Sequence, residues 1–212
     1  MPIETFPIGP LETNCHIVIS GSDAVAVDPG GDLNSGLGEV LALLKEQNLT
    51  LRAILCTHFH FDHLYGVAAL HEATGAPVYG PAGDASLLGT ELGGSGAWGF
   101  PPVTTFKWED LKEGPHTFGS IKCEVLTTPG HTPGGVTLIC GDALFTGDTL
   151  FAGSCGRTDF EGGSMEVELQ SLAKIAALPG DYEVYPGHMD CSTLETERRF
   201  NPYLTALQNR GQ

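Results

Sequence analysis

The stretch Thr57-His58-Phe59-His60-Phe61-Asp62-His63 follows the apolar segment Ala53-Ile54-Leu55-Cys56 and gathers three histidines and one aspartate. Neutral imidazole is the commonest metal ligand in proteins, and crowding imidazoles with a carboxylate is costly unless a cation offsets the lost hydration. The internal position of the stretch, directly after an apolar segment, argues against a histidine-rich surface loop or a purification tag. The stretch therefore predicts a metal site.

The spacing inside this stretch allows it to serve two metal ions. His58 and His60 are two residues apart, so at the end of an extended strand both side chains point to one face. Asp62 and His63 follow after a bend and can address a second position. The same cluster is therefore compatible with two neighbouring metals.

A cluster near residue 60 supplies only part of two coordination spheres, so further ligands are expected at other strand ends. Three places have the same form, which is a short apolar segment, a glycine-containing turn and then one ligand-type residue. These residues are His131 after Cys123-Glu124-Val125-Leu126, Asp148 after Ala143-Leu144-Phe145-Thr146, and His188 after Val184-Tyr185. One such residue alone is more often a hydrogen-bonded turn residue, but their repetition indicates a ligand set.

These residues and their order resemble the metallo-β-lactamase-fold hydrolases, and among them the branch that contains glyoxalase II. The resemblance covers nearly the whole chain, from Cys15-His16-Ile17-Val18-Ile19 and Asp28-Pro29-Gly30-Gly31 to Glu197-Arg198-Arg199-Phe200-Asn201-Pro202. It implies an α/β fold, the four-layer αββα sandwich. Helix-like stretches at Leu33 to Gln47, Leu64 to Thr74 and Ser164 to Leu178 agree with this fold. In the last of them Met165, Leu169, Leu172 and Ile175 recur at helical spacing and are expected to pack in the core.

The resemblance also implies a complete binuclear site. In that family the first metal is held by residues matching His58, His60 and His131, the second by residues matching Asp62, His63 and His188, and a residue matching Asp148 bridges them. Two neighbouring divalent cations can generate a metal-bridging hydroxide that attacks a carbonyl, with Asp62 both coordinating and orienting it. Zinc is the expected metal, and iron and manganese accept the same ligands.

The chain has 212 residues without a proline-, serine- or charge-rich linker, so residues 1–212 are expected to form a single metallo-β-lactamase-like domain. Longer glyoxalase II enzymes add a C-terminal helical domain that grips glutathione, and we expect this chain to lack it. The resemblance thus implies a short thioesterase that cleaves S-lactoylglutathione or a related acyl thioester.

The net charge of −16 arises from 10 basic and 26 acidic residues. Because clustered Lys and Arg supply much of the affinity for nucleic acid, a nucleic-acid substrate is not expected. The N-terminus from Met1 to Phe6 lacks a basic start and an apolar core, and no apolar run approaches the ~20 residues that span a bilayer. We therefore expect a cytoplasmic protein without a membrane partner, and the sequence leaves its oligomeric state open.

The six cysteines include no CxxC pair, and several lie in apolar runs. Buried free thiols behave as small hydrophobic groups, so all six are expected to be reduced. Cys155 is expected to be structural rather than reactive.

The glycine-rich stretch from Leu150 to Gly163 is the main evidence on the substrate. In glyoxalase II a basic residue matching Arg157 contacts the glutathione part of the thioester, which makes Arg157 a substrate-binding candidate. An equally weighted alternative is that Arg157 pairs with Asp159 or Glu161 and holds the loop. Trp98 and Phe100, in the segment Gly93 to Phe100, are expected to pack in the core or loop rather than form the lip of a pocket.

Two other functions remain as alternatives. A mononuclear-iron persulfide dioxygenase shares Gly156-Arg157-Thr158-Asp159-Phe160 and binds iron through residues matching His58, His131 and Asp148. The segments Thr132-Pro133-Gly134-Gly135 and Pro186-Gly187-His188 favour the hydrolase. A non-catalytic metal-binding or redox-sensing module is the third hypothesis. Lone histidines are usually structural, so His16, His71 and His116 are left out of the predicted site.

Overall fold

The computed structural model describes residues 1–94 and 98–210, with side chains up to residue 207. The first of two six-stranded sheets contains, in spatial order, β1 (Ile3–Ile8), β2 (Thr13–Ser20), β3 (Asp23–Val27), β4 (Thr50–Leu55), β5 (Val78–Gly80) and β6 (Glu109–Asp110). Strands β1 to β3 pair antiparallel, and β3 to β6 pair parallel. The parallel half therefore directs the ends of β3 and β4 to the same edge of the sheet.

The second sheet contains, in spatial order, β14 (Ser192–Thr193), β13 (Glu183–Pro186), β10 (Ala143–Gly147), β9 (Val136–Cys140), β8 (Ile121–Thr127) and β7 (Gly114–Phe118). A separate two-stranded ribbon joins β11 (Leu150–Phe151) and β12 (Ser154–Cys155). Both β8 and β10 run antiparallel to β9, and β13 runs parallel to β10. Strands β8, β10 and β13 therefore all end at one edge.

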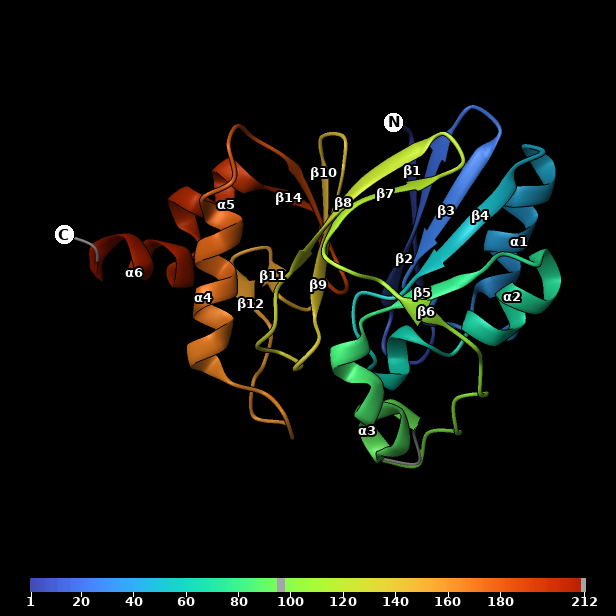
Figure 1. Cartoon of the computed structure of the whole chain (residues 1–212), viewed down its shortest axis with the longest axis horizontal. Coiled ribbons are helices and arrows are strands. Elements are labelled where there is room, and N and C mark those ends of the chain that lie inside the picture. The colour runs from blue at the N-terminus through green and yellow to red at the C-terminus, as the bar shows by residue number, and fades with distance from the viewer. Residues whose placement is uncertain (95–97, 211–212) are drawn as a thin grey trace.

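The helices cover the outer faces of the two sheets (Figure 1). The helices of the described chain are α1 (Leu37–Glu46), α2 (Val67–Thr74), α3 (Glu91–Gly94), α4 (Met165–Ala176), α5 (Leu194–Phe200) and α6 (Pro202–Arg210), with 3-10 helices η1 (Phe61–His63) and η2 (Ala82–Gly89). Helices α1 and α2 lie beside the first sheet, and α4 and α5 beside the second (Figure 1). The predicted αββα sandwich is confirmed.

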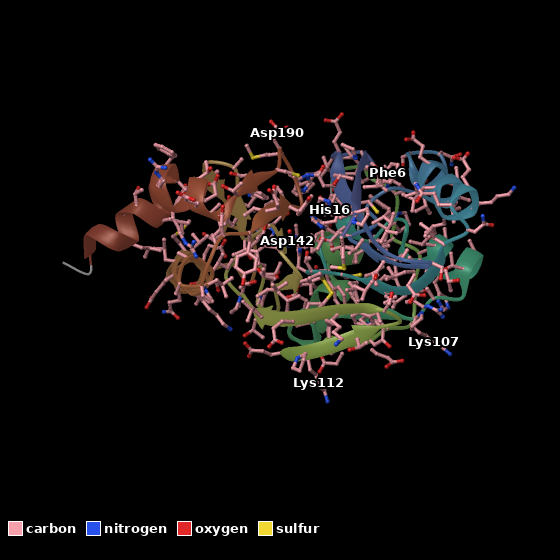
Figure 2. The ribbon with its side chains drawn as sticks, turned by 90° about the horizontal axis from the view of Figure 1, so that it is seen from above. Phe6, His16, Lys107, Lys112, Asp142 and Asp190 are labelled. Carbon is pink, nitrogen blue, oxygen red and sulfur yellow. A yellow bond between two sulfur atoms is a disulfide. The ribbon has the colours of Figure 1, made fainter. Side chains whose placement is uncertain are left out.

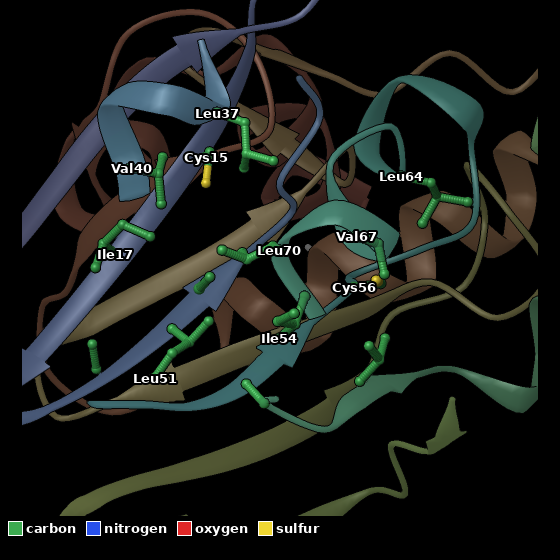
Figure 3. Packing of buried hydrophobic residues seen from close by; sticks show 14 of the residues in the cluster. Cys15, Ile17, Leu37, Val40, Leu51, Ile54, Cys56, Leu64, Val67 and Leu70 are labelled. Atoms are coloured by element: carbon green, nitrogen blue, oxygen red, sulfur yellow. The ribbon is translucent and has the colours of Figure 1, made fainter. Parts of the chain in front are cut away.

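Side-chain alternation along the strands explains the layers. On β2 and β4, Ile17 and Ile54 pack against Leu37 and Leu70 of the helices (Figure 3). The next residues along these strands, Val18 and Leu55, face the second sheet and pack with Val125 and Phe145. Successive strand residues point to opposite faces, so a strand buried on both faces reads as a continuous apolar run.

Helix α4 confirms the expected helix and corrects part of its packing. Ser164 caps its N-terminus by accepting a hydrogen bond from the Val167 N–H at 3.4 Å. Leu172 and Ile175 are fully buried as expected, but Met165 is 39% exposed. Met165 lies in the first turn, and the buried positions of α4 include Glu168 and Ser171. None of the described helices is long and apolar enough to cross a membrane.

The prediction of six free cysteines is wrong for one pair, because a disulfide joins Cys123 to Cys140 (Figure 2). The antiparallel register that sets Glu124 opposite Ile139 also sets these two cysteines opposite each other on β8 and β9. Facing positions on antiparallel strands bring Cα atoms within disulfide reach, although the residues are 17 apart in sequence. Cys15, Cys56, Cys155 and Cys191 are free.

Candidate metal centre

The predicted ligands meet because their strands end at one edge. His131 follows β8, Asp148 follows β10 and His188 follows β13, while the histidine stretch follows β4. Two backbone hydrogen bonds join the sheets there, from the Val136 N–H to the Thr57 carbonyl at 2.9 Å and from the Asn14 N–H to the Gly187 carbonyl at 2.7 Å.

The first ligand group consists of His58, His60 and His131. One ring nitrogen of each lies within 4.8 Å of those of the other two, and all three side chains are buried. His60 Nδ1 is 2.8 Å from His131 Nε2. Such close convergence of imidazole nitrogens is the arrangement that a metal ion would organise.

Hydrogen bonds outside this group fix which nitrogens carry lone pairs. His131 Nδ1 lies 2.7 Å from the Arg157 carbonyl, which can only accept, so Nδ1 carries the proton and Nε2 the lone pair. Thr57 donates its hydroxyl proton to Asp28 at 2.6 Å, so its oxygen accepts from His58 Nδ1 at 3.0 Å. His58 Nε2 is buried without a hydrogen-bond partner. Both rings thus aim a lone pair inward, as metal ligands do.

The second ligand group consists of Asp62, His63 and His188, again with one donor atom each within 4.8 Å of the others. Asp62 Oδ2 lies 3.1 Å from His188 Nε2 and 3.6 Å from His63 Nε2. Thr13 donates a hydrogen bond to the same carboxylate oxygen at 3.1 Å. The two nitrogens and one carboxylate are a ligand set that zinc, iron and manganese all accept.

Asp148 lies between the two groups. Its Oδ2 is 3.5 Å from His131 Nε2 of the first group, and its Oδ1 is 3.4 Å from His63 Nε2 of the second. His188 Nε2 is 3.7 Å from Oδ2. The structure therefore brings all seven predicted ligands together, with Asp148 in the place of a bridge.

The charges of this centre favour bound cations. Burial opposes ionisation of Asp148, but His63 and His131 hold its pKa well below the ordinary value. Burial and the neighbouring His131 lower the pKa of His60 to about 3, so this ring is neutral. In the described part of the chain, the ion-pair partners of Asp62 and Asp148 are histidines alone. Buried carboxylates without Lys or Arg partners fit divalent metals.

Two acidic residues that the sequence analysis did not assign to the site accept hydrogen bonds from the stretch Thr57 to His63. Asp28 accepts hydrogen bonds from the Thr57 N–H at 2.7 Å and from its hydroxyl, and lies 3.0 Å from His63 Nδ1. Asp84 accepts from the Phe59 N–H at 3.0 Å. The available signal for Asp28 was its position after a buried strand and before Pro29-Gly30.

Glu168 of α4 supports His131 in the same manner. It is fully buried, and its Oε2 accepts the His131 N–H at 2.9 Å. Burial raises the pKa of Glu168 to about 8. The sequence did not predict this contact. Helical spacing shows which residues share a face of the helix, but it does not show which loop packs against that face.

A cavity of about 400 Å³ opens beside the metal ligands. Its lining includes His60, Asp62, His131, Asp148 and His188, and also Cys155 and Arg157. Arg157 donates two hydrogen bonds to Asp159, at 2.7 and 2.8 Å. This is the pairing expected if Arg157 holds the loop rather than binds the substrate. Burial raises the pKa of the Cys155 thiol to about 11, so it is a poor nucleophile at neutral pH.

Core or loop packing is the expectation for Trp98 and Phe100, and the structure agrees with it for Phe100. Residues 95–97 lie outside the described structure, but Trp98 is 63% exposed and lines the cavity. Phe100 packs against Phe61, with 5.4 Å between ring centroids. For Trp98, the expectation of core or loop packing rather than a place at the lip of a pocket is therefore wrong.

The three histidines left out of the predicted site belong to neither ligand group. His16 Nε2, His71 Nδ1 and His116 Nε2 each lie within 3.0 Å of a backbone carbonyl, those of Pro186, Ala76 and Lys112. A carbonyl accepts only, so each ring donates a structural hydrogen bond.

Comparison with known proteins agrees with this geometry. Residues 8–188 match the metallo-beta-lactamase superfamily. The chain belongs to this superfamily. As a member it is a metallo-hydrolase, and the predicted resemblance is confirmed at that level.

Three similar proteins each match nearly the whole chain. Hydroxyacylglutathione hydrolase GloC of Haemophilus influenzae is 30% identical, over 97% of this chain and 99% of its own length. The crystal structure of BLEG-1 B3 metallo-beta-lactamase is 36% identical, with a TM-score of 0.88, over 96% of this chain and 100% of that one. The di-iron-bound structure of TTHA1623 is 38% identical, with a TM-score of 0.83 and the same coverage.

Proposed function

We propose that this protein hydrolyses acyl thioesters with two divalent metal ions, as glyoxalase II does, with S-lactoylglutathione or a related thioester as substrate. The observation that carries the proposal is the position of Asp148 between two three-residue ligand groups at the floor of an open cavity. The similarity to GloC supports the thioester as the substrate class.

Bound metal ions and the side chain of Asp62 have different roles in the proposed reaction. Divalent cations bound here supply polarisation of the carbonyl oxygen and acidification of a water molecule. Asp62 lines the cavity, and its carboxylate, held by Thr13, accepts a hydrogen bond from the attacking water and orients it. Hydrolysis forms a bond between the water oxygen and the acyl carbon and breaks the carbon–sulfur bond, which releases a carboxylate, a thiol and a proton.

Zinc is our proposed metal, with iron or manganese as alternatives, because the seven ligands combine imidazole nitrogens and carboxylate oxygens. The di-iron centre of TTHA1623 shows that a structure similar to this one binds two iron ions. We further propose that the protein acts on a small molecule in the cytoplasm, without nucleic acid or membrane partners.

Three assays on one metal-replete preparation test the function. We expect loss of the thioester absorbance of S-lactoylglutathione, and no oxygen uptake with glutathione persulfide. Oxygen uptake without thioester cleavage would identify a persulfide dioxygenase instead. Hydrolysis of a β-lactam alone would place the activity with that of BLEG-1, and inactivity in all three assays would favour a non-catalytic metal-binding module.

A further inference from the structure

Three exposed apolar side chains surround the metal-site cavity. Of the seven large hydrophobic side chains that are exposed in the described chain, three line this cavity: Leu11 (42% exposed), Trp98 (63%) and Met189 (59%). They come from three separate loops, between β1 and β2, after α3 and after β13. Single exposed apolar residues are ordinary, but a group of them around a cavity marks a binding surface. We call these three residues the apolar mouth.

The backbone holds two of these side chains in an uncommon conformation. Trp98 has φ +55° and Met189 has φ +69°, values that bulky residues rarely adopt. The Met189 loop is fixed by Asn14, whose side-chain amide donates to the Met189 carbonyl at 2.9 Å. Such conformations persist where the surrounding structure enforces them, and they concentrate at ligand sites.

Aromatic rings continue the apolar mouth towards the metal ligands. The Trp98 ring centroid lies 5.9 Å from that of Phe61 and 5.7 Å from that of Phe160. The Phe160 ring lies 6.1 Å from the His60 ring. These rings form an apolar stretch of the cavity wall between Trp98 and His60.

Apart from bound metal ions, the described wall of the cavity offers an anionic substrate few basic side chains. Arg157 is the one Lys or Arg among the described residues that line it. Its guanidinium is engaged by Asp159 and lies over the Phe160 ring, 3.9 Å from the centroid. Lys107 and Lys112 project outward from the edge of the molecule (Figure 2). A glutathione thioester, which carries two carboxylates and one ammonium group, finds no unpaired Lys or Arg among the described residues of this wall.

We propose that the apolar mouth binds an uncharged, bulky apolar group of the substrate, so that the enzyme prefers aromatic or long-chain thioesters over glutathione thioesters. This inference rests on the proposed thioester hydrolysis and specifies its substrate. Burial of a phenyl or alkyl group against Trp98 removes apolar surface from water on both sides, and this gain is absent for a lactoyl group.

Thioesters of uncharged thiols separate the acyl and thiol contributions. One series varies the acyl group on N-acetylcysteamine (acetyl, lactoyl, octanoyl, phenylacetyl), and the other varies the thiol on a lactoyl group (N-acetylcysteamine, benzyl mercaptan, glutathione). We expect the best apolar member of at least one series to exceed S-lactoylglutathione in kcat/KM by tenfold or more. A preference for S-lactoylglutathione over every uncharged thioester would overturn the inference and leave thioester hydrolysis intact.

Trp98→Ala tests the assigned residue, with Leu33→Ala as the matched control, because Leu33 is 60% exposed but does not line the cavity. We expect Trp98→Ala to lower kcat/KM about tenfold for the preferred apolar thioester and less than twofold for the acetyl thioester, and Leu33→Ala to change neither. Equal losses for both substrates would contradict the inference.

If no thioester is cleaved, the proposed function fails, and binding still tests the apolar mouth. In a Trp108→Phe background, where Trp98 is the one remaining tryptophan, quenching of fluorescence by the same compounds measures their affinity. Tighter binding of the phenylacetyl thioester than of S-lactoylglutathione, by tenfold or more, is the expected result, and the reverse order would overturn the inference.

Discussion

Asp28 Oδ2 lies 3.0 Å from His63 Nδ1, while the opposite nitrogen of that ring, Nε2, faces Asp148 Oδ1 at 3.4 Å. Asp28 also accepts the Thr57 hydroxyl proton, through which it fixes the proton position on His58. One carboxylate outside the centre therefore contacts a histidine of the second ligand group and, through Thr57, holds a histidine of the first.

Replacement of this carboxylate by an amide is expected to weaken both metal sites. In Asp28→Asn the neutral amide lacks the negative charge that makes His63 a more basic ligand, and it cannot accept both hydrogen bonds from Thr57. Substitution of residues that support metal ligands from outside typically costs 10–100-fold in metal affinity. Competition with a chelator measures the affinity, with the exposed Asp142→Asn as control. Equal affinity of Asp28→Asn and the unmodified protein would show that Asp28 does not support the centre.

Position 187 is expected to tolerate no residue larger than glycine, because there is no room for a side chain. A Cβ at this position would meet Asp148 Oδ1 and come within 2.6 Å of His63 Cε1. Gly187→Ala should therefore displace both side chains, reduce bound metal and lower turnover at least tenfold, although no ligand is removed.

Gly89→Ala is the matched control for this substitution, since a Cβ at Gly89 meets nothing within 4 Å. Metal content by plasma mass spectrometry and the melting temperature of chelator-treated protein separate the effects. Retention of full metal content in Gly187→Ala would refute the role of this close approach.

The cysteines are expected to differ sharply in reactivity. Because burial raises the pKa of Cys155 to about 11, only about one thiol in a thousand is ionised at pH 8. Iodoacetamide should therefore label Cys155 slowly at pH 8 and faster as the pH rises towards 11. Cys191 is exposed, so it should be labelled faster than Cys155 at pH 8. Peptide mass spectrometry follows each site, and fast labelling of Cys155 at pH 8 would contradict its buried thiol.

The Cys123–Cys140 disulfide is expected to stabilise the second sheet. It closes a loop of 17 residues in sequence separation, which corresponds to about 3 kcal/mol of unfolding free energy in the loop-entropy description. Urea unfolding of the oxidised protein and of Cys123→Ala/Cys140→Ala measures the difference. Identical unfolding midpoints would indicate that the bridge contributes nothing to stability.

The sequence indicated the candidate ligands because one group follows β4 and the others follow three further strands, and the family resemblance completed the set. His131, Asp148 and His188 repeat one local pattern, and parallel strand directions bring such strand ends to one edge. The αββα layers were implied by the family resemblance, and the helix-like stretches agreed with it. Local pattern and global fold agree at these positions.

The features that escaped prediction depend on contacts between distant segments. The Cys123–Cys140 pairing follows from strand register, which residue spacing does not encode. The contact of Asp28 with His63 crosses from the end of β3 to η1, and the exposure of Trp98 depends on a loop whose path is not set by periodicity. Each requires the tertiary structure to be known.

Asp148 tests the central claim that one carboxylate joins two metal positions. Metal content per chain should be about two in the unmodified protein, close to zero in Asp148→Ala, and about one in His188→Ala, because His188 belongs to the second group only. Plasma mass spectrometry on the three proteins, purified side by side, measures these values directly. Retention of two metals by both variants would contradict the bridging position of Asp148.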